Sequence, residues 1–343
     1  MVEKLRIVQE VAAAVGLAEG EAGVDAVIAA LSRLEPVSIR RISRTVQLPV
    51  PIVASVCGEL RKRDVVAHER PAQLTKRGRE LFATGRVELP PSVCPTCAGL
   101  GTVVPGELGP LAAELAKFER TAPPARLDLD QCHCTVGTKL RRVLAMNDAD
   151  ALVGRRILLL GDDDLTSLAI QSVVREFGRG STVPELTVLD VDPELLAFVR
   201  DRLADAPFPV SCVHHDLRLP LPPDLWHGFD TVLTDPPYTA PAARLFLSRA
   251  AAALGVRGGN VFLSFGSKRP GAAHALQRAI DEMGFLIRRL VPDFNDYLGA
   301  GALGGTSHLY HLVATPELRP SVNGTSREPL YTGEVPRPDP HSS

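Results

Sequence analysis

Short apolar runs alternate with helix-like stretches from Gly154 to about Ala314, and this alternation restricts the possible folds more than any other feature of the sequence. The runs that we predict to be strands cover residues 157–160, 186–190, 210–213, 231–234, 261–265, 286–290 and 309–313. Helical segments between successive strands are typical of a doubly wound, mostly parallel sheet. The sequence therefore predicts an α/β, Rossmann-like domain over residues 146–315.

The 343-residue chain is long enough for more than one domain, and residues 24–88 predict a winged helix-turn-helix domain. Helical patterns cover residues 25–34, 38–46 and 51–63, and short strands at 65–67 and 72–74 would form the wing before a last helix. Residues 37–80 hold ten Lys or Arg against four Asp or Glu, which fits contact with nucleic acid. We favour dimerisation or a lid over an active site instead, because the third helix carries few polar side chains that could contact bases.

The remaining segments are assigned from composition and from breaks in the pattern. Residues 1–23 predict an N-terminal helical extension, residues 89–145 a connector with four of the six cysteines, and residues 316–343 a disordered tail with six prolines. We find no secretory signal and no apolar run long enough to span a membrane, so we expect a cytoplasmic protein. The formal net charge of −2 argues against a surface devoted as a whole to nucleic acid.

The turn after the first predicted strand is strongly acidic. Gly161 follows the strand directly and precedes Asp162, Asp163 and Asp164 at the start of a helix. Ligands of doubly wound sheets bind at the carboxyl ends of the strands, so we expect this turn to contact a cofactor. Three carboxylates would repel a pyrophosphate there, and the turn lacks the glycine pattern of dinucleotide-binding proteins. The predicted ligand is therefore cationic.

Acids also follow the second and third predicted strands. Asp190 ends the second strand, where a carboxylate can accept hydrogen bonds from both hydroxyls of a ribose. Asp216 follows the third strand and could accept a hydrogen bond from the amino group of an adenine. An Asp at a strand end is often only a helix cap, but the order and spacing of these acids together predict a nucleoside site.

The fourth predicted strand ends in Asp235-Pro236-Pro237-Tyr238. The two prolines hold the backbone rigid, so the carboxylate of Asp235 can accept a hydrogen bond from an amine while the ring of Tyr238 packs against it. A proline-rich turn with a buried tyrosine is the alternative interpretation. We expect an amine-presenting loop.

Four of the cysteines form two close pairs, Cys94 with Cys97 and Cys132 with Cys134. Four thiolates are the number that a tetrahedral structural zinc needs, and in a reducing compartment such pairs suggest a metal more than disulfides. The gap between the pairs is longer than in typical zinc ribbons, so a redox pair or unlinked thiols stay open as alternatives. We expect a structural zinc site.

The combination of motifs is similar to that of two families. An Asp or Asn followed by Pro-Pro-Tyr on a Rossmann-like sheet resembles amino-methyltransferases that act on exocyclic amines of nucleic acids. The run Gly-Asp-Asp-Asp-Leu-Thr-Ser at 161–167, the loop 235–239 and the Cys-Pro-Thr-Cys segment at 94–97 resemble more closely the branched-chain polyamine synthases, or N4-bis(aminopropyl)spermidine synthases. This resemblance covers roughly residues 24–314, and the second cysteine pair departs from it.

The resemblance implies a methyltransferase-type sheet and a transferase that moves aminopropyl groups from decarboxylated S-adenosylmethionine to spermidine or a related polyamine. The acidic first turn agrees, because it would repel the carboxylate of ordinary S-adenosylmethionine. An amine would displace methylthioadenosine at the propyl carbon next to the sulfonium, with Asp162 or Asp235 as the candidate base. The expected assembly is a homodimer.

Two other functions stay open. One is a nucleic-acid amino-methyltransferase that uses S-adenosylmethionine and holds a flipped base with Asp235 to Tyr238. The other is a DNA-binding regulator whose α/β domain senses a nucleoside or a polyamine. The glycine-rich segment 298–305 is either a closing lid or a plain mobile loop.

Overall fold

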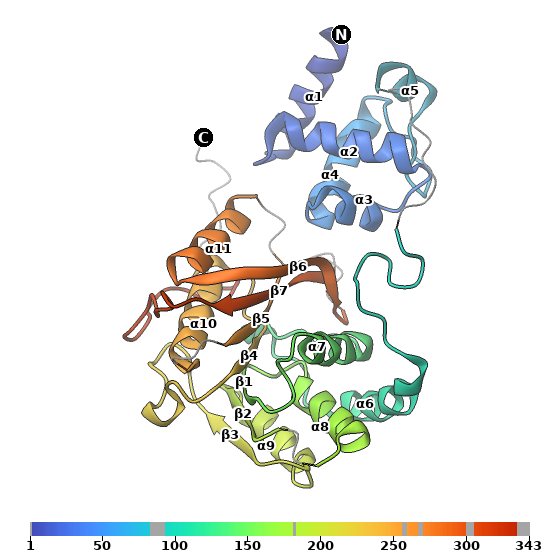
Figure 1. Cartoon of the computed structure of the whole chain (residues 1–343). Helices are drawn as coiled ribbons and strands as arrows, with labels where there is room; N and C mark the ends of the chain where they lie inside the picture. Colours follow the sequence, from blue (N-terminus) through green and yellow to red (C-terminus); the bar gives the residue numbers. More distant parts are fainter. Residues whose placement is uncertain are drawn as a thin grey trace. The chain divides into compact units, whose positions relative to one another are not determined.

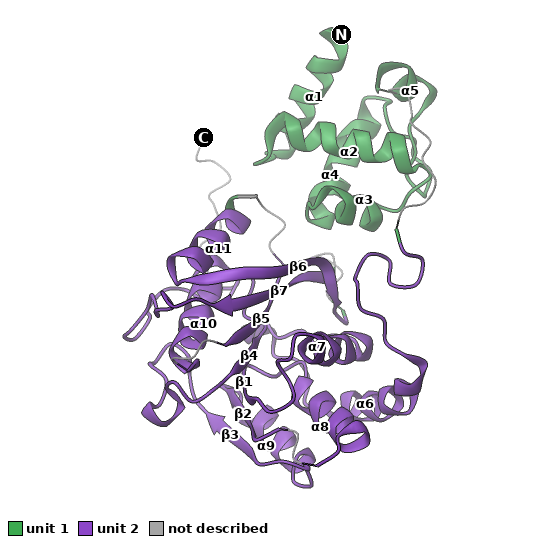
Figure 2. Ribbon diagram, viewed as in Figure 1, with its two compact units in different colours: residues 1–93, 268–271, 299–305 green, residues 94–267, 272–298, 306–343 purple. Residues whose placement is uncertain are grey.

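The computed structural model describes residues 2–82, 93–180, 183–255, 259–266, 270–299 and 305–334. They form two compact units (Figure 2). The first unit comprises residues 1–93 with the short segments 268–271 and 299–305, and the second comprises the rest of the chain. Most of the predicted lid at 298–305 lies outside the described residues, which include only 298, 299 and 305 of it.

The first unit is mainly helical. Its helices are α1 (Val2–Val15), α2 (Gly20–Leu34), α3 (Ile39–Val46), α4 (Val50–Lys62) and α5 (Lys76–Phe82). Ser38 caps α3, because its side chain accepts a hydrogen bond from the backbone N–H of Arg41 at 3.2 Å. An antiparallel bridge joins Val66 to Leu74, where the sequence predicts the wing. The positions of these elements agree with the predicted ones, and the winged-helix assignment itself stays a prediction.

Helix α1 is part of the same core as the helices that follow it. Val11 of α1, Val27 of α2 and Val53 of α4 are fully buried in one apolar cluster. Removing these side chains from water stabilises all three helices together. The predicted N-terminal extension is helical at α1, and α1 packs into the same core as the helices that follow it.

In its described part, the second unit holds a seven-stranded sheet in the order β3-β2-β1-β4-β5-β7-β6 (Figure 1). The strands are β1 (Arg156–Leu160), β2 (Glu185–Asp190), β3 (Val210–His214), β4 (Thr231–Thr234), β5 (Asn260–Phe265), β6 (Phe285–Asp296) and β7 (Thr306–Ala314). Strands β1 to β5 pair in parallel, and β7 runs antiparallel between β5 and β6. Strand order reverses at β1 and β4, and ligands bind at such switch points.

Each face of the sheet packs into its own apolar core, because side chains alternate along each strand. Ile157 and Leu159 of β1 enter a cluster with α6 (Gly109–Thr121), α7 (Val136–Asp148), α8 (Thr166–Phe177) and α9 (Pro193–Arg202). Leu158 and Leu160 enter a cluster with α10 (Ala240–Ala253) and α11 (Pro270–Glu282). Helices thus cover both faces (Figure 1), as the doubly wound prediction requires.

The predicted connector is largely part of the second unit, which begins at Cys94. It contains α6 (Gly109–Thr121) and α7 (Val136–Asp148). Short 3-10 turns lie before α6 at Gly106–Leu108 and between the two helices at Leu127–Leu129, and another lies between β3 and β4 at Pro223–Leu225. Leu115 of α6 and Leu140 of α7 are buried in the core that covers β1. This apolar face ties both helices to the sheet, so α7 is positioned to contribute to a site at the strand ends.

The tail differs from its prediction. Residues 316–334 pack along α10, and Leu330 is 2% exposed in a cluster with Ala242 and Leu245. The backbone of Val322 both donates to and accepts from the hydroxyl of Ser248, at 2.8 and 3.2 Å. A few apolar contacts and these hydrogen bonds suffice to hold a segment without a periodic apolar face, so the expectation of disorder is wrong for residues 316–334.

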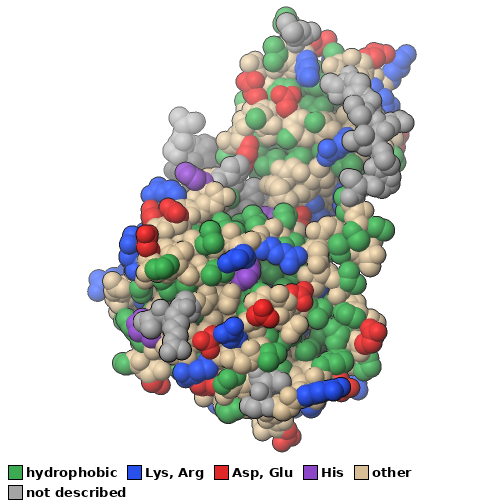
Figure 3. Space-filling model, in the orientation of Figure 1, with side chains coloured by type: hydrophobic (Ala, Val, Ile, Leu, Met, Phe, Trp, Pro, Cys, Tyr) green, Lys and Arg blue, Asp and Glu red, His purple; other side chains and the backbone are tan. Residues whose placement is uncertain are grey.

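Basic and acidic side chains are interspersed over the face of the second unit shown in Figure 3. This mixture agrees with the small formal net charge of −2. Among the described residues, no helix is both long enough and apolar enough to cross a membrane.

Candidate active site at the strand ends

The acidic first turn lies at the carboxyl end of β1, as predicted. Gly161 has a φ of 81°, in the region that favours glycine, and its N–H donates to the carbonyl of Leu189 in β2 at 2.8 Å. The turn then leads into α8 and sends its three carboxylates to three different sets of partners. These partners determine what each aspartate can do.

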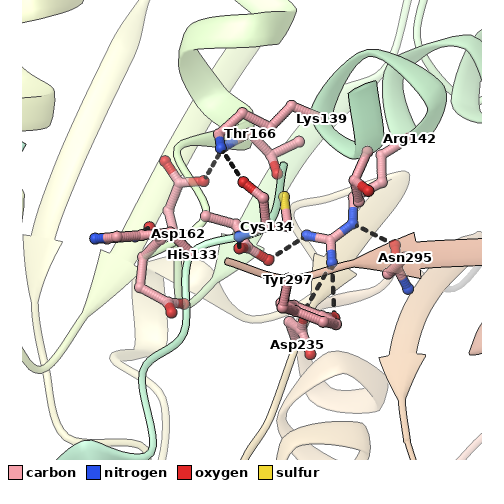
Figure 4. A network of polar contacts seen from close by, with 12 residues as sticks. His133, Cys134, Lys139, Arg142, Asp162, Thr166, Asp235, Asn295 and Tyr297 are labelled. Atoms are coloured by element: carbon pink, nitrogen blue, oxygen red, sulfur yellow. Dashed lines mark hydrogen bonds and ion pairs between the residues drawn. The ribbon is translucent and has the colours of Figure 1, made fainter. Parts of the chain in front are cut away.

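Asp162 caps helix α8. Its Oδ1 accepts hydrogen bonds from the backbone N–H groups of Thr166 at 2.7 Å and Ser167 at 3.2 Å, and its Oδ2 accepts from the Ser167 hydroxyl. The side chain is 2% exposed, and burial raises its pKa to about 7 although the helix hydrogen bonds favour the ionised form. Figure 4 shows Asp162 apart from Arg142 and its partners. Its geometry is that of a structural cap.

Asp163 is held by the segment that carries the second cysteine pair. Its Oδ2 accepts from the backbone N–H of Cys132 at 3.0 Å, and its carbonyl oxygen contacts Nδ1 of His133. Among the described residues no cation forms an ion pair with it. Burial, together with the neighbouring Asp164 and Asp235, raises its pKa well above the usual range. Asp163 is thus an acid that an incoming ammonium would stabilise.

Asp164 and Asp235 are joined by one buried guanidinium (Figure 4). Arg142 of α7, 1% exposed, donates from Nη1 to Asp164 at 2.5 Å and from Nη2 to Asp235 at 2.6 Å. Its Nε donates to the side-chain oxygen of Asn295 in β6 at 2.9 Å. We call Arg142, Asp164, Asp235, Asn295 and Tyr297 the Arg142 network. It joins the ends of β1, β4 and β6.

Two tyrosines complete the surroundings of Asp235. The hydroxyl of Tyr297 donates to Oδ2 of Asp235 at 2.6 Å, and that of Tyr238 lies 3.2 Å from Oδ1. The two hydroxyls are 2.7 Å apart. A Cβ added at Gly266 would come within 2.6 Å of the Tyr238 ring, so glycine at the end of β5 makes room for this side chain. The predicted loop residues Asp235 and Tyr238 therefore do lie together at the strand end.

The two carboxyls that share Arg142 have pKa values shifted in opposite directions. Burial raises the pKa of Asp235 to about 7 although Arg142 favours its ionised form. Burial acts on Asp164 in the same direction, but Arg142 and Lys139 outweigh it and lower its pKa. A hydrogen bond between the two carboxyls strengthens this difference. Asp164 therefore stays ionised, and Asp235 can gain or lose a proton near neutrality.

The acids predicted to bind a nucleoside line a cavity of about 50 Å³. We call it the strand-end cavity; its lining includes Gly161, Asp190, His215, Asp216, Leu330 and Tyr331. Asp190 accepts from the backbone N–H groups of Asp162 at 3.0 Å and Asp192 at 2.8 Å. Asp216 accepts from the N–H of Arg218 at 2.9 Å. The structure thus brings these two acids together beside the first turn.

The expected zinc site is not supported. Among the described residues, no group of three or more His, Cys, Asp or Glu is placed to hold a metal ion. Cys94 is exposed, whereas Cys134 is fully buried and its N–H donates to Asp164. Burial raises the pKa of Cys134 well above the usual range, which opposes the thiolate that zinc requires. The second cysteine pair belongs to the acidic site.

Several residues of the site were not found from the sequence. Helix α7 contributes Lys139 and Arg142, and the end of β6 contributes Asn295 and the adjacent Tyr297. Strand β6 extends to Asp296 rather than to the predicted Leu290. Cys134 pairs with Tyr297 in an antiparallel bridge, and Leu298 donates its N–H to the carbonyl of His133 at 2.9 Å. The sequence indicated these residues only indirectly: three adjacent acids in one turn are stabilised by a nearby cation if they are buried.

Comparison with known proteins identifies the family. Residues 111–317 match the family model of the branched-chain polyamine synthase A C-terminal domain. The chain belongs to the branched-chain polyamine synthase family. The resemblance stated from the motifs, and with it the assignment to a family of transferases, is confirmed.

Relatives of the branched-chain polyamine synthase family match most of the chain. An uncharacterized protein of Methanocaldococcus jannaschii is 34% identical over 96% of this chain and 82% of its own length. The N(4)-bis(aminopropyl)spermidine synthase of Thermus thermophilus is 30% identical over 96% of this chain and 90% of its own length. The crystal structure of the Thermus thermophilus branched-chain polyamine synthase, in complex with N4-aminopropylspermidine and 5′-methylthioadenosine, has a TM-score of 0.74 and 25% identity over 97% of this chain and 98% of that chain.

Proposed function

We propose that this protein transfers aminopropyl groups from decarboxylated S-adenosylmethionine to spermidine or a related polyamine. The observation that carries the proposal is the Arg142 network, which holds an acid of near-neutral pKa, Asp235, at the same edge of the sheet as the strand-end cavity. The family membership supports it, because relatives carry the name N(4)-bis(aminopropyl)spermidine synthase. The cavity would take the nucleoside, and the acids would take the amines.

The charges favour the decarboxylated donor. Asp162 is compensated by the N-terminus of α8, and Asp164 by Arg142, so Asp163 is left as the acid of the first turn without a cationic partner among the described residues. An ammonium near Asp163 would form an ion pair there, whereas the carboxylate of ordinary S-adenosylmethionine would add a repulsive charge. Donor choice therefore rests chiefly on Asp163.

The reaction needs a base for the attacking nitrogen. As the nitrogen bonds to the propyl carbon, the carbon–sulfur bond breaks, and sulfur keeps the electron pair in methylthioadenosine. The proton released by nitrogen goes to a carboxylate. We place this role at Asp235, because its pKa is about 7 and its partners are side chains, which can rearrange when an amine binds. Asp162 has a similar pKa, but two of its hydrogen bonds come from the backbone at the start of α8, which the fold holds in place. Tyr238 would pack its ring beside the amine.

Product analysis by mass spectrometry tests this proposal. The purified chain is incubated with spermidine and either decarboxylated or intact S-adenosylmethionine. We expect products heavier by one or more aminopropyl groups, together with methylthioadenosine, only with the decarboxylated donor. Methyl transfer to an amine, or no product with either donor, would contradict the proposal.

A matched pair of variants assigns the donor choice to a residue. Asp163→Asn should raise the KM for decarboxylated S-adenosylmethionine by about tenfold or more, the effect of one lost ion pair in a buried site. Asp201→Asn, on the exposed side of α9, serves as the control. If both variants keep the wild-type KM, Asp163 does not select the donor.

A further inference from the structure

The side-chain amide of Asn295 is held in one orientation. Nε of Arg142 donates to Oδ1 of Asn295 at 2.9 Å (Figure 4), and a guanidinium offers no acceptor, so the amide oxygen must face Arg142. The amide nitrogen then points to Ser307, which pairs with Asn295 across β6 and β7, and donates to its hydroxyl oxygen at 2.9 Å. Asn295 and Ser307 are both fully buried, so bulk water does not compete for these hydrogen bonds.

The hydroxyl of Tyr297 has a fixed direction as well. It lies 2.6 Å from Oδ2 of Asp235, and an ionised carboxylate can only accept, so the proton in this contact belongs to Tyr297. A phenol has only one proton to donate. In the 2.9 Å contact between Tyr297 and Ser307 the proton must therefore come from Ser307. Nη2 of Arg142 lies 3.2 Å from the same phenol oxygen and can only donate to it.

These contacts close into a cycle that begins and ends at Arg142. Its members donate in one direction, from Arg142 to Asn295, Ser307, Tyr297 and finally Asp235, whose Oδ2 also accepts from Nη2 of Arg142 at 2.6 Å. We call these five residues the hydrogen-bond cycle. Hydrogen bonds that run in one direction polarise and strengthen one another in a protein interior. The cycle therefore keeps Tyr297 as a donor to Oδ2 of Asp235.

The two oxygens of Asp235 differ as a result. Oδ2 accepts from Arg142 and Tyr297, whereas the only donor to Oδ1 among the described residues is the Tyr238 hydroxyl, at 3.2 Å. Tyr238 has one proton and a closer acceptor, the oxygen of Tyr297 at 2.7 Å. Tyr238 can therefore donate to Tyr297 and leave Oδ1 without a donor. Oδ1 is then the oxygen that can accept a proton.

We propose that Tyr297 and Ser307 are positioning residues that direct the proton of the attacking amine to Oδ1 of Asp235. The inference rests on the proposed function and adds to it the oxygen that accepts the proton. As the nitrogen bonds to the propyl carbon, its N–H bond breaks and an O–H bond forms at Oδ1, while sulfur leaves with the electron pair of the carbon–sulfur bond. The Tyr297 hydroxyl stabilises the carboxylate before this transfer.

The titratable and charged side chains that face Asp235 come from several parts of the chain. They are Arg142 of α7, Asp163 and Asp164 of the first turn, Cys132, Tyr238 and Tyr297. Arg142 and the hydrogen bond from Tyr297 favour the ionised form of Asp235, whereas the charge of Asp164 favours the protonated form. Removal of the Tyr297 hydroxyl therefore raises the pKa of Asp235 and leaves every charge in place.

The pH profile of kcat/KM, measured on the full-length chain with decarboxylated S-adenosylmethionine and spermidine, tests the hydrogen-bond cycle. Tyr297→Phe removes a donor to Oδ2, so the rise of kcat/KM should move from about pH 7 to about pH 8. Relative to wild type, kcat/KM should be roughly tenfold lower at pH 6 and within about twofold at pH 9. General damage to the site would instead lower kcat/KM at every pH.

Ser307→Ala tests the cycle one step further from Asp235. It keeps the Tyr297 hydroxyl but removes the donor to it, so the rise should shift upward by less than in Tyr297→Phe. Ser264→Ala in β5 and Tyr310→Phe in β7 are matched controls, because both residues are buried and lie outside the hydrogen-bond cycle. The Ser264 hydroxyl has no hydrogen-bond partner among the described residues. Both controls should keep the rise near pH 7, and thermal melting shows that each variant is folded.

The outcomes separate this inference from the proposed function. If the wild-type chain transfers aminopropyl groups but Tyr297→Phe and Ser307→Ala keep its pH profile, the inference is overturned while the proposed function stands. A loss in Tyr297→Phe that is equal at every pH overturns it too, because the role of Tyr297 is then only structural. If the wild-type chain transfers no aminopropyl group, the proposed function itself fails and the inference with it.

Discussion

Asp190 is the last residue of β2 and Asp235 follows β4, and both strands pair with β1. The carboxylates of the two residues nevertheless accept hydrogen bonds from different kinds of group. Asp190 accepts from two backbone N–H groups, those of Asp162 and Asp192. Asp235 accepts from side chains, the guanidinium of Arg142 and the hydroxyl of Tyr297. Backbone donors are fixed by the fold, whereas side-chain donors can rearrange. The comparison suggests that Asp190 positions a ligand and that Asp235 takes part in chemistry.

Loss of the cation of the Arg142 network should have the largest effect. Arg142→Met leaves Asp164 and Asp235 buried without their shared partner, so we expect the free energy of unfolding to fall by about 3–5 kcal/mol. Transfer activity should fall by roughly a hundredfold or more. Denaturant melts and steady-state rates measure the two effects.

A surface arginine provides the matched control for Arg142. Arg175 of α8 pairs with Glu114 at 2.7 Å, and the two side chains are 45% and 31% exposed. Arg175→Met should change stability by about 0–1 kcal/mol and leave the rate unchanged. If Arg142→Met lowers the free energy of unfolding no more than Arg175→Met does, the Arg142 network does not stabilise the fold.

Isosteric changes at the two compared acids should separate binding from catalysis. Asp235→Asn removes the proposed base, so kcat should fall roughly 10²–10⁴-fold while the Kd for 5′-methylthioadenosine stays near wild type. Asp190→Asn should instead raise that Kd by about tenfold or more, because a charged acceptor is lost. Kinetics and calorimetry on both variants would show this crossed pattern. The same change in Kd for both variants would refute the division.

The pH dependence should report Asp235. Its pKa of about 7 means that kcat/KM rises with pH through about 7, as the carboxyl loses its proton and becomes a base. The sign for stability is opposite. Because the folded-state pKa lies above the unfolded value of about 3.9, the contribution of Asp235 to stability is complete below about pH 4 and is lost as the pH rises through about 7. A flat kcat/KM from pH 5.5 to 8.5 would exclude Asp235 as the base.

The smallest effect is expected at Asp162, whose pKa is also about 7. Asp162→Ala removes the cap of α8 and should lower the free energy of unfolding by about 0.5–2 kcal/mol, with the rate within about tenfold of wild type. The rise in kcat/KM near pH 7 should persist in this variant. If transfer is abolished at unchanged stability, Asp162 and not Asp235 is the base.

The strands and the strand-end acids could be predicted because their signals are local. Each predicted acid directly follows a short apolar run, and parallel strands bring their carboxyl ends to one edge. The partners of these acids could not be predicted in this way. Arg142 lies on a helix that precedes the sheet, and Tyr297 follows the irregular strand β6, so only the folded chain brings them to Asp235.

The cysteines show how a local pattern can mislead. Two close pairs satisfy the count for zinc, but Cys132 and Cys134 alternate around His133 in an extended segment that binds the first turn through its backbone. The tail gave the opposite error. Its prolines and lack of periodicity indicated disorder, yet Leu330 and the carbonyls bound by Arg249 hold it in place.

Arg142 also has a consequence for how the protein folds. Its partners Asp164, Asp235 and Asn295 lie 22, 93 and 153 positions away in the chain. Contacts of such high sequence separation form late, after the loops between them have been closed. The site therefore forms only when both halves of the sheet are assembled. A chain that is interrupted or misfolded in either half would lack the complete Arg142 network.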